Sequence, residues 1–183
     1  HAMTAGPKPS STSNRHALRA GIQHALRHRD IAHILLMVGI VSAFAVPYRT
    51  FLPVIAREIL DVGAWQYGLL LAATGVGAAV SAFVLAGLQL QVAQYRRLLP
   101  VGLGAFAMAL GAVAVSEHYV LSLLCLVIAG GAGVIYFNAS NTTIQLSVTD
   151  AYRGRVMSLY IFMHQGTSAI GSVILGVIAH TYS

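Results

Sequence analysis

A short stretch rich in amides carries the side chains best suited to chemistry. The row consists of Asn138, Asn141, Thr142 and Gln145. Their spacing of i, i+3, i+4 and i+7 places them along one face of a helix. Amides surrounded by lipid are costly unless they bond to a neighbouring helix or face water. The row therefore predicts either the polar wall of a substrate cavity or hydrogen bonding to the next helix, and the sequence leaves both open.

Three further polar side chains lie inside apolar segments. Tyr160 and His164 fall in the last apolar segment, and His164 is the only histidine well inside such a segment. Histidine titrates near neutral pH, so it could carry a proton in a transport cycle, with hydrogen-bonded packing as the alternative. Arg49 in the first segment could meet an anionic substrate, but we favour a side chain that snorkels to the headgroups.

Motifs for catalysis and for cofactor binding are missing from the sequence. It contains no Gly-x-Ser-Gly turn, no His-Glu-x-x-His metal motif and no phosphate-binding P-loop. We therefore expect no catalytic residue, no metal site and no cofactor. The single cysteine, Cys125, allows no disulfide within the chain.

The distribution of charge indicates which elements must position these groups. Hydrophobic residues make up 57% of the chain and charged residues 9%, against roughly 25% charged in an ordinary soluble domain. The stretches without any charge are residues 62–95, 98–116, 118–149 and 156–183. Each exceeds or approaches the roughly 20 residues that a helix needs to cross a bilayer. Buried helices of a soluble protein are excluded, because too little charge remains to cover them.

The composition predicts an all-α integral membrane protein, a polytopic bundle of about five transmembrane helices in contact with lipid. The expected bundle covers residues 31–183, with spans at about 31–55, 67–90, 98–115, 119–146 and 155–180. Pro47 and Pro53 predict a kink or an unwound end in the first span. We expect Pro100 in the first turn of the third span, and Asp150 as the cap of the fifth.

The residues ahead of the bundle predict two parts and an orientation. Residues 1–14, rich in Ser, Thr, Pro and Gly, predict a disordered tail. Residues 15–30 predict a basic amphipathic linker helix on the cytoplasmic side. With the N-terminus in the cytoplasm, nine of the eleven Lys and Arg residues lie inside. This bias explains the net charge of +6 without a nucleic-acid partner.

The order of these motifs resembles the C-terminal half of a major facilitator superfamily transporter. The run Asn138-x-x-Asn141-x-x-x-Gln145, followed by Asp150-x-x-Arg153-Gly154-Arg155, resembles the region of helices ten and eleven. The similarity points to the branch of the enterobactin exporter and macrolide-efflux-like proteins. Leu52-Pro53 resembles the end of helix seven, and Tyr67-Gly68 resembles the start of helix eight.

This resemblance implies roles for particular residues. The five spans would be helices seven to eleven of a major facilitator fold, in which helices seven, eight, ten and eleven line the cavity. A lining role follows for Asn138, Asn141, Gln145, Tyr160 and His164, and Thr142 joins them from the same row. Asp150, Arg153 and Arg155 would serve a cytoplasmic loop or gate, or anchor the helix ends. The loop at residues 91–97 departs from the pattern, because its two arginines have no acidic partner nearby.

Two functional hypotheses follow. In the first, the chain is part of a secondary active transporter in the plasma (inner) membrane. That transporter would export small amphipathic substrates of the drug or siderophore type by alternating access, with an N-terminal half supplied elsewhere. In the second, it is a small membrane protein that acts as a partner or assembly subunit without transport of its own.

Overall fold

The computed structural model describes residues 28–88 and 90–182, and side chains as far as Val177. These residues form helices and short connections, with no strand in either range. The elements are α2 (Arg29–Phe44), α3 (Tyr48–Val54), η1 (Ile55–Ile59), α4 (Ala64–Gly87), α5 (Val92–Val115), α6 (Tyr119–Ser147), α7 (Asp150–Ile161), η2 (Phe162–Gly166) and α8 (Thr167–Tyr182). The predicted tail at residues 1–14 and most of the predicted linker helix at residues 15–30 lie outside the described residues.

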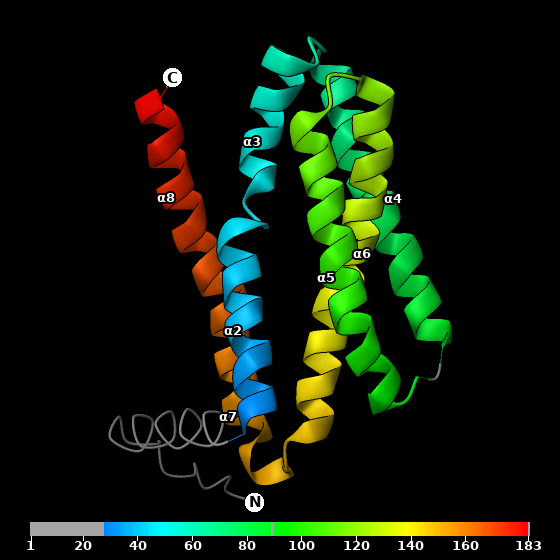
Figure 1. Cartoon of the computed structure of the whole chain (residues 1–183), viewed down its shortest axis with the longest axis vertical. Coiled ribbons are helices and arrows are strands. Elements are labelled where there is room, and N and C mark those ends of the chain that lie inside the picture. Colours follow the sequence, from blue (N-terminus) through cyan, green and yellow to red (C-terminus); the bar gives the residue numbers. More distant parts are fainter. Residues whose placement is uncertain (1–27, 89, 183) are drawn as a thin grey trace, which may run out of the picture.

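The helices have the length and composition of membrane spans. Among the residues that the structure describes, four helical stretches qualify on both counts, namely Arg29–Ile59, Ala64–Gly87, Val92–Val115 and Tyr119–Ser147. The 24 residues of α4 rise about 36 Å, which exceeds the roughly 30 Å of a hydrocarbon core. The run from α7 through η2 to α8 is also continuous and crosses the same thickness (Figure 1). The fold is therefore a polytopic helical membrane bundle.

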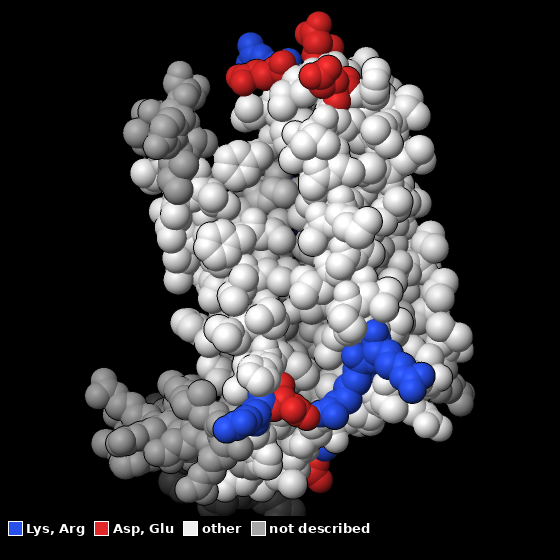
Figure 2. Space-filling model, in the orientation of Figure 1, with Lys and Arg blue, Asp and Glu red and all other residues white. Residues whose placement is uncertain are grey.

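The surface agrees with a bilayer environment. Charged side chains gather at the two ends, and the band between them is uncharged on the face shown in Figure 2. Large apolar side chains are exposed along this band, among them Phe83 at 80% and Met108 at 77%. The end at which α2, α5 and α7 begin carries five arginines and two aspartates, and we call it the basic end.

The first helical stretch is interrupted near its middle. Helix α2 ends at Phe44, a turn covers residues 45–47, and α3 begins at Tyr48. Pro53 inside α3 has no N–H for the carbonyl of Arg49, and the π-helical turn η1 follows directly. The break therefore falls where the two prolines predicted it.

The third helix begins earlier than the sequence predicted. Helix α5 starts at Val92, so the expectation that it begins near Leu98 with Pro100 in its first turn is wrong. The cause is a capping box, in which the backbone N–H of Gln91 donates to Oε1 of Gln94 at 2.7 Å. Pro100 consequently lies inside the helix.

The last helical run also starts earlier than expected. The N-cap residue of α7 is Thr149, whose side chain makes no capping hydrogen bond, and Asp150 already lies in the first turn. The prediction that Asp150 caps this helix is therefore wrong. An acidic residue in the first turn still favours the helix, because it faces the positive end of the helix dipole.

Small residues let the helices pack at backbone contact. A Cβ added at Gly77 of α4 would lie 1.8 Å from the carbonyl oxygen of Val127, and one at Gly130 of α6 would lie 2.0 Å from that of Thr74. Helices α4 and α5 each pack against α6, and α2 packs with η2 and α8 (Figure 1). At that second contact, Gly171 of α8 faces the carbonyl of Ala43 in the same way.

Candidate functional site

A polar cluster lies where α2, α6 and the π turn η2 meet. A hydrogen bond of 2.9 Å joins Oγ of Ser42 in α2 to Nδ1 of His164 in η2. The His164 ring stacks on Phe137 of α6, with centroids 4.2 Å apart and planes inclined by 27°. Counted along each helix, these residues lie about 15–21 Å from the basic end, in the middle of the bilayer.

The π turn η2 places the His164 side chain against Ser42 and Phe137. A π turn widens the helix by one residue and is often found at functional sites. Next to it, the hydroxyl of Thr167 donates to the carbonyl of Gly39 in α2 at 3.0 Å. Two side-chain bonds, one from within the turn and one from the residue that follows it, therefore fix the α2–η2 contact.

Tyr160 fastens the last helical run to α6. Its hydroxyl donates to the carbonyl of Phe137 at 2.9 Å, and its side chain is 4% exposed. The same hydroxyl lies beside the amide of Asn141. Tyr160 and His164 therefore both contact Phe137, which links their positions. Because its side chain is buried, Tyr160 offers little surface to a substrate.

The amide row follows one face of α6, as its spacing predicts, and two of its hydrogen bonds lie within the helix, while Asn141 also meets the hydroxyl of Tyr160 in α7. Thr142 donates to Oδ1 of Asn138 at 3.5 Å, and Nε2 of Gln145 donates to Oδ1 of Asn141. Asn138 and Gln145 are exposed, while Asn141 and Thr142 are half-buried. Donors and acceptors on the two exposed amides remain free to meet water or a solute.

The residues predicted for the cytoplasmic loop gather at the joint between α6 and α7. Arg153 pairs with Asp150 at 2.6 Å, and its Nε donates to the carbonyl of Gln145 at 3.2 Å. The second contact caps the end of α6. Arg155 takes no part in this network, and its guanidinium lies 5.8 Å from the ring centre of Tyr152.

An ion pair missed from the sequence lies at the same end. Arg96 of α5 pairs with Asp30 of α2 at 2.5 Å, although 66 residues separate them. The sequence of residues 91–97 contains no acid, and the partner of Arg96 comes instead from the start of α2. The only sequence signal for this ion pair was Asp30, an acidic residue at the start of the first span. Ser42, the one hydroxyl in the apolar part of α2, was missed as well.

Arg49 lies near the start of α3, and its side chain is exposed. It precedes the end of its helical stretch at Ile59 by ten residues, or about 15 Å. Its Nε donates to the hydroxyl of Tyr48 at 3.4 Å, and its guanidinium lies 5.9 Å from the centre of that ring. The ion pairs formed within the described ranges do not include Arg49. An ionisable residue at such depth is a candidate for function.

Metal ligation has no geometric support in the part of the chain that the structure describes. Within it, no three His, Cys, Asp or Glu side chains lie close enough to hold an ion. The polar cluster and the amide row consist of hydroxyl, imidazole and amide groups, so their arrangement is suited to hydrogen bonding and stacking.

Comparison with known proteins identifies relatives along nearly the whole chain. A major facilitator family described as transmembrane secretion effector matches residues 7–183. The enterobactin exporter EntS of Escherichia coli O127:H6 is 28% identical over 160 residues, which cover 87% of this chain and 38% of the exporter. The enterobactin exporter EntS of Salmonella typhi is 29% identical with the same coverage. The chain thus spans well under half the length of these relatives. No solved structure matches it significantly.

Proposed function

Because this chain belongs to the transmembrane secretion effector family of the major facilitator superfamily, we propose that it forms one bundle of a secondary exporter of small amphipathic molecules. Its relatives in Escherichia coli and Salmonella are exporters more than twice as long. Alternating access needs two bundles that rock around a site between them. The second bundle would come from the remainder of the same polypeptide or from another chain.

The polar cluster at Ser42, Phe137 and His164 is the observation that supports this proposal. Polar groups at mid-bilayer are expensive, and they mark substrate or ion pathways in most membrane proteins that contain them. The cluster combines a hydroxyl, an imidazole and an aromatic face at the meeting point of three helical elements. Asn138 and Gln145 extend the polar surface from this level towards the basic end.

The substrate wall has the character that amphipathic solutes require. The exposed amides of Asn138 and Gln145 can donate or accept hydrogen bonds, and the stacked rings of Phe137 and His164 present an apolar surface. Thr142 and Asn141 orient the exposed amides from within the helix. Tyr160 positions this wall through its bond to Phe137, whereas Arg49 adds a positive charge nearer the opposite end.

The distribution of arginine favours a cytoplasmic basic end in the inner membrane. Cytoplasmic loops retain Lys and Arg, and the basic end holds five of the seven arginines in the described residues. In this orientation Asp30–Arg96 and Asp150–Arg153 hold the cytoplasmic ends of α2, α5, α6 and α7. An ion gradient would drive the rocking motion of the bundle, and these two ion pairs lie at the end of the bundle that faces the cytoplasm.

An efflux measurement tests the proposal. The full-length gene product containing this chain would be expressed in cells that lack their main exporters. Retention of a cationic dye, a macrolide and a catecholate siderophore would then be followed. We expect faster loss of at least one compound, abolished by Asn138→Ala with Gln145→Ala. The control pair Leu121→Ala with Ile128→Ala, exposed on α6 about a quarter turn away, should retain efflux.

The opposite result has a defined meaning. If no compound is exported and a partner protein fails to accumulate in membranes without the chain, the chain acts as an assembly subunit. If the control pair abolishes efflux as completely as the amide pair does, the amide row has no special part in transport.

A further inference from the structure

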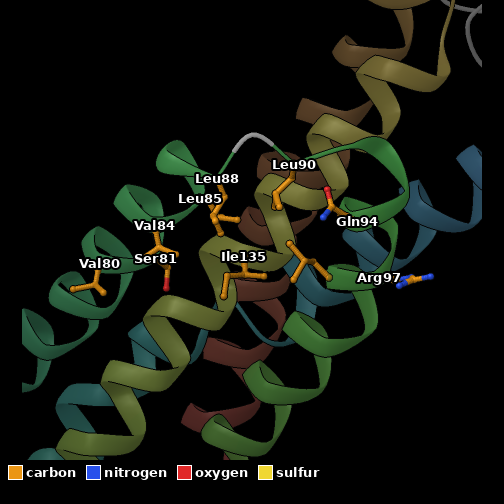
Figure 3. Close-up of a pocket in the computed structure, with 10 residues that line it drawn as sticks. Val80, Ser81, Val84, Leu85, Leu88, Leu90, Gln94, Arg97 and Ile135 are labelled. Atoms are coloured by element: carbon orange, nitrogen blue, oxygen red, sulfur yellow. The ribbon is translucent and has the colours of Figure 1, made fainter.

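A cavity separate from the polar cluster lies at the basic end between α4, α5 and α6. It has a volume of about 420 Å³. One wall consists of Val80, Val84 and Leu88 on α4, and Ile135 of α6 forms the floor (Figure 3). We call this cavity the α4–α5 groove.

The groove is lined mostly by apolar side chains, with three polar residues among them. Ser81 comes from α4, whereas Gln94 and Arg97 come from the first two turns of α5. Figure 3 shows the α4 side chains on one side and Gln94 and Arg97 on the other, with the Arg97 guanidinium directed away from the apolar wall. The residues from Val80 to Leu88 span about 12 Å along the bilayer normal. An apolar slot with a cation at its rim matches an acyl chain joined to a headgroup.

Uncompensated positive charge surrounds the polar rim. Arg96 is already paired with Asp30, while the ion pairs among residues 28–88 and 90–182 leave out Arg97. The first turns of α2 and α7 contain Asp30 and Asp150, but the first turn of α5 contains no acid. The positive end of the α5 dipole therefore adds to the charge of Arg97.

We propose that the α4–α5 groove binds an anionic phospholipid, with one acyl chain against Val84 and Leu88 and the phosphate at Arg97. The groove lies at the basic end, beside the first two turns of α5. Its cation and helix N-terminus both favour a negative headgroup over a zwitterionic one. The lipid would fill the space between α4 and α5 at the cytoplasmic side.

Native mass spectrometry of the purified full-length protein tests this proposal. Phosphatidylglycerol and phosphatidylcholine with identical acyl chains would be added at equal concentration. We expect phosphatidylglycerol to be retained in preference. Arg97→Gln should reduce this preference about fivefold, the factor expected for one basic residue near a membrane surface. Arg57→Gln, at the opposite end, should leave the preference unchanged.

A second pair of variants tests the acyl-chain slot. Val84→Trp fills the groove and should abolish retention of the bound lipid. Val76→Trp is the matched control, because Val76 lies on the same helix outside the groove and is 56% exposed, against 55% for Val84. Equal retention of the two lipids by the unaltered protein, or equal retention by the two tryptophan variants, would overturn the proposal.

Discussion

His164 joins three helical elements through two kinds of contact. Its Nδ1 is bonded to Ser42, and its ring lies on Phe137. A net hydrogen bond contributes about 0.5–1.5 kcal/mol, and an aromatic pair contributes a similar amount. The same side chain can therefore stabilise the α2–α6–η2 junction and present a polar face within it.

A double-mutant cycle measures the bond between Ser42 and His164. Ser42→Ala and His164→Ala should each lower the free energy of unfolding in detergent. The double variant should lose less free energy of unfolding than the two single variants lose together, and the difference, the coupling energy, should be about 0.5–1.5 kcal/mol. Additive losses would show that the two residues do not interact in the folded protein.

Arg49 gives a prediction about substrate charge. Its depth and its neutral partner, Tyr48, suit recognition of an anionic substrate group. Arg49→Ala should reduce efflux of substrates that carry a carboxylate or phenolate, and leave efflux of cationic dyes intact. Arg57→Ala, at the end of the same stretch, serves as the control. Equal loss for anionic and cationic substrates would assign Arg49 to folding instead of recognition.

At the scale of helices, glycine contacts determine how closely the elements approach. Helices in lipid gain little from hydrophobic burial, so dispersion at short range between small faces is the main attraction. The carbonyl of Val127 occupies the space that a Cβ at Gly77 would need, whereas Gly75 on the same helix has no atom within 4 Å of its added Cβ.

The two glycines make a matched pair of variants. Gly77→Ala should force α4 from α6 and lower the free energy of unfolding by about 1–3 kcal/mol or more. Gly75→Ala should be neutral or slightly stabilising, because alanine favours helix over glycine. Thermal unfolding in detergent distinguishes the two. A Gly77→Ala protein as stable as Gly75→Ala would contradict the close α4–α6 contact.

For the whole molecule, much of the architecture was accessible from the sequence because bilayer thickness fixes the length of apolar stretches. The kink near Pro47 followed from backbone chemistry alone. Hydropathy could not show that α5 extends back to Val92, since polar residues outside the apolar core continue the helix when Gln91 and Gln94 cap it. The pairs Asp30–Arg96 and Ser42–His164 depend on tertiary packing across 66 and 122 residues.

The helices meet as two groups, and the polar groups lie along their junction. Helices α2, η2 and α8 pack together on one side, and α4 and α5 each pack against α6 on the other. Tyr160, His164 and the pair Asp30–Arg96 connect the groups. A solute route along the amide row would run beside this junction and reach water at the basic end.

The most direct test of this account is the water accessibility of the amide row in native membranes. Single cysteines would replace Asn138 and Gln145 in a Cys125→Ala background, and a membrane-impermeant maleimide would be applied to inside-out vesicles. We predict that both positions react, while a cysteine at Ile128, exposed on the same helix, does not. Protection of Asn138 and Gln145 equal to that of Ile128 would show that the row is sealed from water, and would contradict a substrate route along α6.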